Sequence, residues 1–154
     1  MECLDNILKH NLAFNALLNG KGNIVVNDVS DEALLLTSAF LKLKRNIVVV
    51  KANQYEANML YQKVMLLNEK DVSLFAVDES YRIEALAASP ELLGQRIDTM
   101  YQLTKNEPRI LITHSQAIIR HLPTKQLFID NCLKIKVGMQ IDIYDLKASL
   151  LKSG

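Results

Sequence analysis

The sequence has little of what several classes of protein require. Its two cysteines, Cys3 and Cys132, lie far apart and outside any CxxC or Cys/His cluster, so zinc or redox chemistry is not indicated and we expect reduced thiols in a cytoplasmic protein. Its 18 Lys and Arg residues nearly balance 17 Asp and Glu residues, which leaves no large basic field of the kind that dedicated nucleic-acid binders carry. The N-terminus has neither a secretory signal nor a spanning apolar run, and no membrane partner is expected.

The residues that are present predict an α/β fold. At 154 residues and 49% hydrophobic, the chain is about one domain long and can bury a sizeable core. Four apolar runs rich in β-branched residues recur: NIVVN from Asn23, NIVVV from Asn46, VSLFAV from Val72 and RILIT from Arg109. Because these runs are continuous rather than alternating, they indicate strands covered on both faces, as in a parallel sheet.

Segments of helical length separate these strands. Apolar residues at helical spacing predict helices over Ser30–Lys44, Gln54–Leu67 and Leu92–Leu103, and an N-terminal amphipathic helix over Leu4–Leu18 that ends at Gly20. The alternation of strands and helices predicts a three-layer, mostly parallel sheet flanked by helices.

After Pro123 the alternation stops. Leu133–Val137 is predicted to form a strand, followed by a Gly turn and a helix over IDIYDLKASLLK, which we interpret as the opening of a second α+β unit. The expected organisation is an N-terminal helix over 1–22, an α/β domain over 23–126 and a truncated second domain over 127–154.

The first predicted strand is followed by a loop in the place of a phosphate-binding loop. A phosphate loop needs glycines that let backbone N–H groups converge, a Lys for the β and γ phosphates, and a Ser or Thr for magnesium. This loop has neither Gly nor Lys and consists of Asn27, Asp28, Val29, Ser30, Asp31 and Glu32. Its three carboxylates would repel a triphosphate, whereas Asp28 or Ser30 can cap the following helix and Asp31 and Glu32 can complement its dipole. We therefore predict a degenerate phosphate loop that binds no nucleotide.

The loop after the third predicted strand, residues 78–89, is a candidate interaction site because loops at the carboxyl ends of parallel strands carry function in such folds. Its candidate residues are Asp78, Glu79, Ser80, Tyr81 and Arg82. An apolar strand that ends in Asp-Glu is how ATPases present a magnesium-binding acid, but that pair works only beside a phosphate loop. We therefore favour the interpretation that Asp78 and Glu79 are simply the solvated end of a strand.

The remaining polar residues form no strong motif. His114 and His121 share a helix face only if residues 115–120 are helical, and without a carboxylate or Cys in register they make a poor metal pair. Ser115, His114 and Asp78 can be combined into a triad on paper, but no nucleophile elbow supports it. We predict no metal and no catalytic residue.

Two long segments resemble the N-terminal region of bacterial transcription-repair coupling factors. They are GQRIDTMYQLTKNEPRILITHSQAIIRHLP, Gly94 to Pro123, and LKIKVGMQIDIYDLKASLLKSG, Leu133 to Gly154. The first carries an Arg-x-x-Thr-hydrophobic-Tyr-x-Leu helix at Arg96 to Leu103 and an LP turn at Leu122-Pro123. The second opens on a Leu-Lys-hydrophobic-Lys-hydrophobic-Gly run. Many members have an aromatic-rich Asp-Trp-Glu segment after the third strand, whereas this chain has Val77 to Tyr81 there and no Trp.

The resemblance implies a function as well as a fold. That region of the family is similar to the excinuclease subunit UvrB, so the resemblance implies a degenerate helicase domain and an N-terminal fragment that is not itself an enzyme. It implies that the full-length protein is an ATP-dependent DNA translocase that displaces stalled RNA polymerase and recruits nucleotide excision repair. ATP, magnesium, DNA and RNA polymerase would then bind to later domains. UvrA would bind chiefly to the second UvrB-like domain and weakly or not at all to this fragment.

Two rival hypotheses come from other classes of protein. One is a nucleotide-dependent enzyme in which Asp78 and Glu79 serve a relocated site. The other is a free-standing α/β ligand-binding domain.

Overall fold

The computed structural model describes residues 8, 10–20, 22–77, 90–119, 121–133 and 135–153. The chain divides into two compact units, residues 1–120 and 121–154. The first unit contains α2 (Leu12–Asn19), α3 (Val29–Leu43), β1 (Ile47–Lys51), α4 (Gln54–Leu67), β2 (Val72–Phe75), α5 (Pro90–Thr104), β3 (Ile110–His114) and α6 (Ser115–Ile118). The second contains α7 (Lys125–Asp130) and α8 (Ile143–Ser153).

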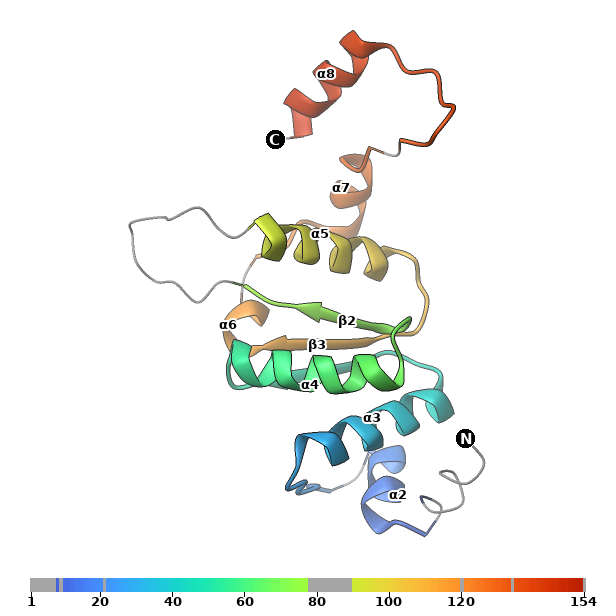
Figure 1. The fold of residues 1–154 in the computed structure, drawn as a ribbon, viewed down its shortest axis with the longest axis vertical. Helices are drawn as coiled ribbons and strands as arrows, with labels where there is room; N and C mark the ends of the chain where they lie inside the picture. Colours follow the sequence, from blue (N-terminus) through green and yellow to red (C-terminus); the bar gives the residue numbers. More distant parts are fainter. Residues whose placement is uncertain are drawn as a thin grey trace. The chain divides into compact units, whose positions relative to one another are not determined.

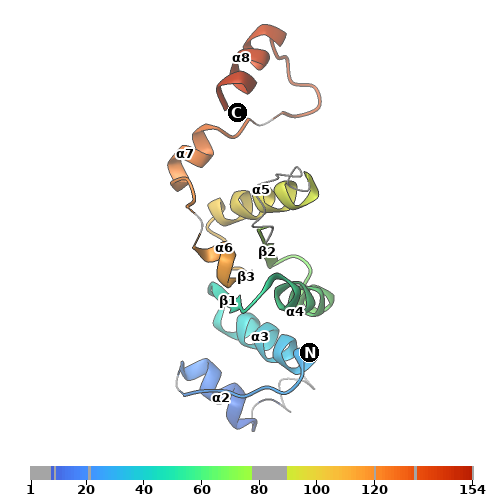
Figure 2. The same ribbon diagram turned by 90° about the vertical axis from the view of Figure 1, so that its left-hand side faces the viewer.

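The first unit is built on a parallel sheet of three strands in the order β1-β3-β2. The chain moves two places across the sheet from β1 to β2 and returns one place to β3. With right-handed crossovers, such a reversal puts the two connecting helices on opposite faces. Figures 1 and 2 show this arrangement, with α5 on one side of the sheet and α4 on the other, and α3 packed beside α4. The predicted α/β class with a parallel sheet between helices is therefore confirmed.

The strand predicted at the first apolar run is wrong. Residues 23–26 have no strand partner in the described part of the chain and lead into α3 as irregular backbone, with Val25 87% exposed. Strand formation requires a partner for the backbone N–H and C=O groups, and a local run of β-branched residues does not supply one. β1 also departs from the prediction, because Val48 and Val50 are exposed and only the alternate residues are covered. β2, by contrast, is buried along its whole length.

The main core lies between the sheet and α4. Leu60 and Val64 of α4 are fully buried against Leu74, Ile110 and Ile112 of the strands. A second cluster joins α2 to α3, where Phe14 packs against Ala39 and continues to Ile47 at the start of β1. These clusters fix α3 and α4 on the same face of the sheet.

The opposite face is held to α5 by polar contacts. The Thr99 hydroxyl, buried in α5, donates to the Leu74 carbonyl oxygen of β2 at 2.8 Å. The Arg96 guanidinium lies over the Phe75 ring, 5.3 Å from its centroid. Arg96 and Thr99 belong to the helix motif that carries the family resemblance, so that motif positions α5 on the sheet.

Side-chain caps explain where several helices begin. Of the helix predicted over residues 4–18, residues 4–7 and 9 lie outside the described residues. Residues 10 and 11 are not helical, and the Asn11 side chain accepts the Phe14 N–H and starts α2 at Leu12. Gly20 ends α2 in the left-handed conformation, as predicted. The Asn53 side chain likewise caps α4, whose bounds match the predicted Gln54–Leu67.

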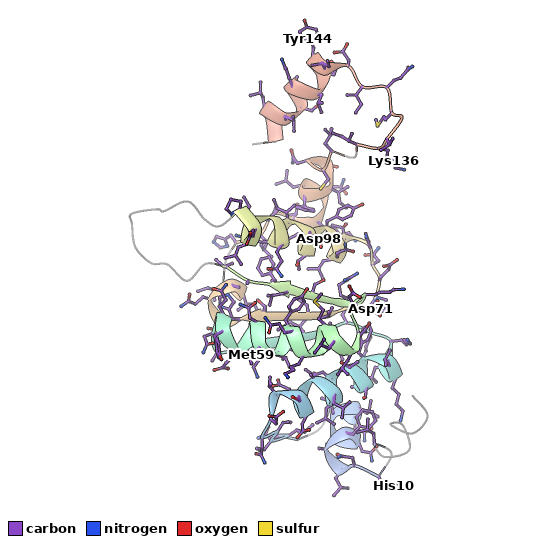
Figure 3. The ribbon with its side chains drawn as sticks, viewed as in Figure 1. His10, Met59, Asp71, Asp98, Lys136 and Tyr144 are labelled. Carbon is purple, nitrogen blue, oxygen red and sulfur yellow. The ribbon has the colours of Figure 1, made fainter. Side chains whose placement is uncertain are left out.

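The second unit has no buried side chain among its described residues. The strand predicted at Leu133–Val137 is wrong, since the described residues of this segment form no strand. The turn at Gly138, with φ of 84°, and the helix α8 are present as predicted. Tyr144 of α8, 82% exposed, points away from its helix in Figure 3. In neither unit do the described residues include a helix with the length and apolar character that a membrane crossing needs.

Candidate functional site

The loop before α3 is a helix cap. The Asp28 carboxylate accepts the Ser30 backbone N–H at 2.6 Å and serves as the N-cap of α3. This backbone hydrogen bond is the main reason why the pKa of Asp28 lies below its usual value, because it stabilises the charged form. Asp31 and Glu32 follow in the first turn, where their charges complement the helix dipole. Of the two predicted caps, the structure therefore uses Asp28.

Glu32 binds a lysine that ends the neighbouring strand. The Lys51 ammonium donates to both carboxylate oxygens of Glu32, with Nζ–Oε1 and Nζ–Oε2 distances of 3.1 and 2.9 Å. Lys51 is the last residue of β1, so the pair lies at the carboxyl edge of the sheet, where folds of this class place their ligands. Both side chains are about three-quarters buried, at 21% and 25% exposed. The pair thus neutralises Lys51 at the point where a phosphate would need a cation.

Two further contacts hold this edge of the sheet. The Ser115 hydroxyl donates to the Ala52 carbonyl oxygen at 2.7 Å, which ties α6 to the end of β1. The His114 side chain is fully buried, and its Nε2 accepts the Val77 N–H at 3.2 Å, which ties β3 to the end of β2. Ser115 and His114 therefore have separate partners, and these contacts do not assemble the triad that can be written on paper.

The structure does not place all of the candidate residues. Asn27, Asp28, Ser30 and Asp31 are exposed, and Val29 and Glu32 are partly buried. Asp78, Glu79, Ser80, Tyr81 and Arg82 lie outside the described residues, so the interaction loop stays a prediction. His114 and His121 fall in different units. Within the described parts of the chain, no group of three or more His, Cys, Asp and Glu side chains is arranged to hold a metal ion.

Four helices begin at this edge, and three of them, α3, α4 and α5, have acidic side chains in their first turns. α6 follows β3 directly, α4 and α5 come after β1 and β2 along the chain, and α3 runs antiparallel to β1, so all four helices begin at the carboxyl edge. Their dipoles would favour an anion, but Asp28, Asp31 and Glu32 already supply negative charge at the start of α3.

The role of Lys51 was not visible in the sequence. It is separated from Glu32 by 19 positions and is one of many scattered basic residues. The topology could have indicated this contact, because a helix that runs antiparallel to the next strand has its first turn beside the last residue of that strand. The sequence alone does not show that the two side chains meet there.

These features define a small α/β module with a parallel sheet. At the carboxyl edge of this sheet, polar side chains form a helix cap, an ion pair and two hydrogen bonds. No family model matches the chain, and no solved structure matches it. Several curated proteins do match.

The chain is similar over its whole length to the transcription-repair-coupling factor of Bacillus subtilis strain 168, with 27% identity over 161 residues. It is 23% identical to that of Staphylococcus haemolyticus over 88% of the chain and 26% identical to that of Rickettsia bellii over 71%. The resemblance predicted from the sequence is therefore confirmed. The chain spans only 14%, 12% and 10% of the lengths of these three relatives.

Proposed function

We propose that the chain is a non-catalytic structural and protein-interaction module of a transcription-repair coupling factor. The observation that carries this proposal is the Glu32–Lys51 ion pair at the carboxyl edge of the sheet. A nucleotide phosphate at this edge would have to displace Glu32 from Lys51 and approach Asp28 and Asp31 as well. The loop offers no glycine-built backbone cradle in compensation.

The proposed history is that of a helicase-like domain that kept a parallel sheet between helices and lost its phosphate site. The capped start of α3, together with the strand-to-helix order of the first unit, supports this history. Asp28 gives the loop a structural role that does not depend on a ligand, because a cap stabilises the helix directly.

For the whole protein we propose the activity that the resemblance implies. It would be a cytoplasmic, ATP-dependent DNA translocase that displaces stalled RNA polymerase and recruits nucleotide excision repair. ATP, magnesium, DNA and RNA polymerase would bind to later domains. UvrA would bind to the UvrB-like module, chiefly through its second domain. The description shared by the relatives, which names both transcription and repair, supports this proposal.

A pull-down with UvrA tests which domain of the UvrB-like module binds UvrA. The bait is B. subtilis UvrA, and two segments of the B. subtilis relative are compared as prey. The shorter segment is the one that matches this chain. The longer segment continues through the second UvrB-like domain. We expect only the longer segment to be retained well. Equal retention of the two segments would overturn the proposal that the second domain carries the UvrA contact.

The rival hypothesis of a nucleotide-dependent enzyme is tested on the same chain. If Asp78 and Glu79 served a relocated site, the chain would hydrolyse ATP and replacement of both residues by Ala would abolish the hydrolysis. We expect no hydrolysis by the unmodified chain.

A further inference from the structure

α5 is attached to the sheet in a different way from α4. Three residues of α4, Ala57, Leu60 and Val64, are fully buried in the main core, whereas Thr99 is the only buried residue of α5. Leu92, which is partly exposed, is the residue of α5 that packs against the main core. Burial of apolar surface supplies most of the free energy that holds a helix on a sheet. α5 therefore receives much less of this free energy than α4, which lies on the opposite face (Figure 1).

Polar contacts supply the rest of the attachment of α5. Besides the Thr99 hydrogen bond and the Arg96 contact described above, the Gln102 Oε1 atom accepts the Arg109 Nη2–H at 3.3 Å. A hydrogen bond of this kind changes an equilibrium by only about two- to tenfold, because the same groups bind water when the contact is broken. The side-chain contacts of α5 are separate from the pairing of β2 with β3. α5 can therefore leave the sheet while the strands stay paired.

The attached helix also covers charge that has no acidic partner. Arg109 is 7% exposed, and its guanidinium donates to neutral acceptors, namely the Lys70 carbonyl oxygen, the Ser73 hydroxyl and Gln102. Within the described residues, neither Arg96 nor Arg109 forms an ion pair, and the Nε atom of each is buried without an acceptor. Burial of a cation that is incompletely hydrogen-bonded costs free energy. Opening of α5 would let water reach both guanidinium groups and would thus relieve this cost.

We propose that α5 opens from the sheet as a unit while the three strands, α3 and α4 stay folded. A detached helix of 15 residues is marginal in water, so the helix itself unfolds in this open form and its amides exchange with solvent. In the closed form, with α5 on the sheet, Ser73 and Phe75 of β2 are buried, and opening exposes them. The first unit therefore has a conformational change that costs less free energy than unfolding of the whole unit.

Native-state hydrogen exchange of the full chain tests this proposal. Amide exchange is measured at urea concentrations below the unfolding transition, in the central turns of α5, residues 97–101, and of α4, residues 58–64. We expect the α5 amides to share one protection factor that is lower than that of the α4 amides. This protection factor should depend only weakly on urea, because opening of one helix exposes little surface.

The variant Leu60→Ala separates the opening of α5 from the unfolding of the whole unit. α4 stays packed in both the closed and the open form, so this change should leave the exchange of α5 unchanged. It should speed the exchange of α4 about hundredfold, because those amides exchange through unfolding of the core. If Leu60→Ala fails to fold, Val64→Ala makes the same distinction with a smaller loss of buried atoms.

The variant Thr99→Val acts on the closed form, because it removes the hydrogen bond to the Leu74 carbonyl oxygen. It should speed the exchange of α5 about tenfold. Ile97→Val is the matched control, since it places the same residue type at an exposed position of the same helix. It should change the exchange of α5 by less than about twofold.

Three results would overturn the proposal. They are one common protection factor and urea dependence for α4 and α5; equal acceleration of both helices by Leu60→Ala and by Val64→Ala; and equal effects of Thr99→Val and Ile97→Val on the exchange of α5.

Discussion

The Glu32–Lys51 ion pair joins the start of α3 to the end of β1, and a double-mutant cycle should show that the two residues are energetically coupled. The cycle compares the unmodified chain with Glu32→Gln, Lys51→Met and the double variant. Each single change removes one charge and keeps most of the side-chain volume. The difference between the double variant and the sum of the single variants isolates the pairwise free energy.

The geometry sets the expected magnitude. Both carboxylate oxygens lie within 3.1 Å of Nζ, which favours a strong pair, whereas exposure of 21% and 25% of the side chains lets water screen it. Fully exposed pairs contribute about 0.2–1 kcal/mol, and loss of one partner from a buried pair costs about 3–5 kcal/mol. We therefore expect a coupling free energy of about 1 kcal/mol, at the upper end of the range for exposed pairs.

Urea unfolding followed by far-ultraviolet circular dichroism measures the four free energies. The coupling should fall in 1 M NaCl, where the Debye length is about 3 Å. A matched control cycle combines Glu32→Gln with Lys63→Met, because Lys63 forms no ion pair with Glu32 among the described residues, and its coupling should be well below that of Glu32 with Lys51. A coupling free energy of zero, or one that salt does not change, would refute the claim that this ion pair joins the start of α3 to the end of β1.

Three other changes test the packing and capping. Leu60→Ala, in the fully buried centre of the core, should lower the free energy of unfolding by about 3 kcal/mol, as measured by urea unfolding. Thr99→Val should cost about 1–2 kcal/mol in the same assay, because it removes the hydrogen bond to the Leu74 carbonyl oxygen. Hydrogen bonding to Ser30 lowers the pKa of Asp28 in the folded state below the unfolded pKa of 3.8. The charged Asp28 carboxylate therefore stabilises the fold above pH 3.8, and this stabilisation is lost as the pH falls through the pKa of the folded state. Asp28→Asn, which keeps a capping side chain, should therefore reduce the loss of thermal stability on acidification below about pH 4.

Two of these changes have a control variant in the same part of the chain. Leu66→Ala, at an 82% exposed position of α4, should cost less than about 0.5 kcal/mol, and a cost equal to that of Leu60→Ala would contradict the assigned core. Asp31→Asn removes the same charge from the first turn of α3 without touching the cap. If it alters the acid response as much as Asp28→Asn does, the cap is not the cause. Retention of full stability by Thr99→Val would show that the hydrogen bond does not hold α5.

The helices could be predicted from the sequence because their signals are local. The run of apolar residues over Gln54–Leu67 and the capping residue Asn53 lie within one segment, and the helix has the bounds that the pattern predicts. The same holds for the start of α3, where Asp28 caps and two acids follow. Such signals need no information about the rest of the fold.

The strands were harder to predict because a strand depends on its neighbour. Residues 23–26 and 47–50 look alike in sequence, yet only the second run pairs with β3. The continuous apolar character of that run also suggested cover on both faces, whereas its position at the sheet edge leaves Val48 exposed. Pairing and edge position are properties of the whole fold, so the composition of a single run does not determine them.

The candidate site shows the same difference between local features, which the sequence predicts, and long-range contacts, which it does not. The absence of glycine and lysine from Asn27 to Glu32 could be read directly, and the residues that are present predicted a cap at Asp28 or Ser30, of which the structure uses Asp28. The contact between Glu32 and Lys51, and that between Val77 and His114, join segments far apart in the chain. They depend on how the strands and helices pack, which no local pattern specifies.

Isothermal titration of the intact chain with ATP and magnesium tests the central claim, that this fold has lost its nucleotide site. The account predicts no heat of binding up to millimolar ATP, and none for Glu32→Gln, because freeing Lys51 does not restore a phosphate cradle. Saturable binding at micromolar affinity by the unmodified chain would contradict it.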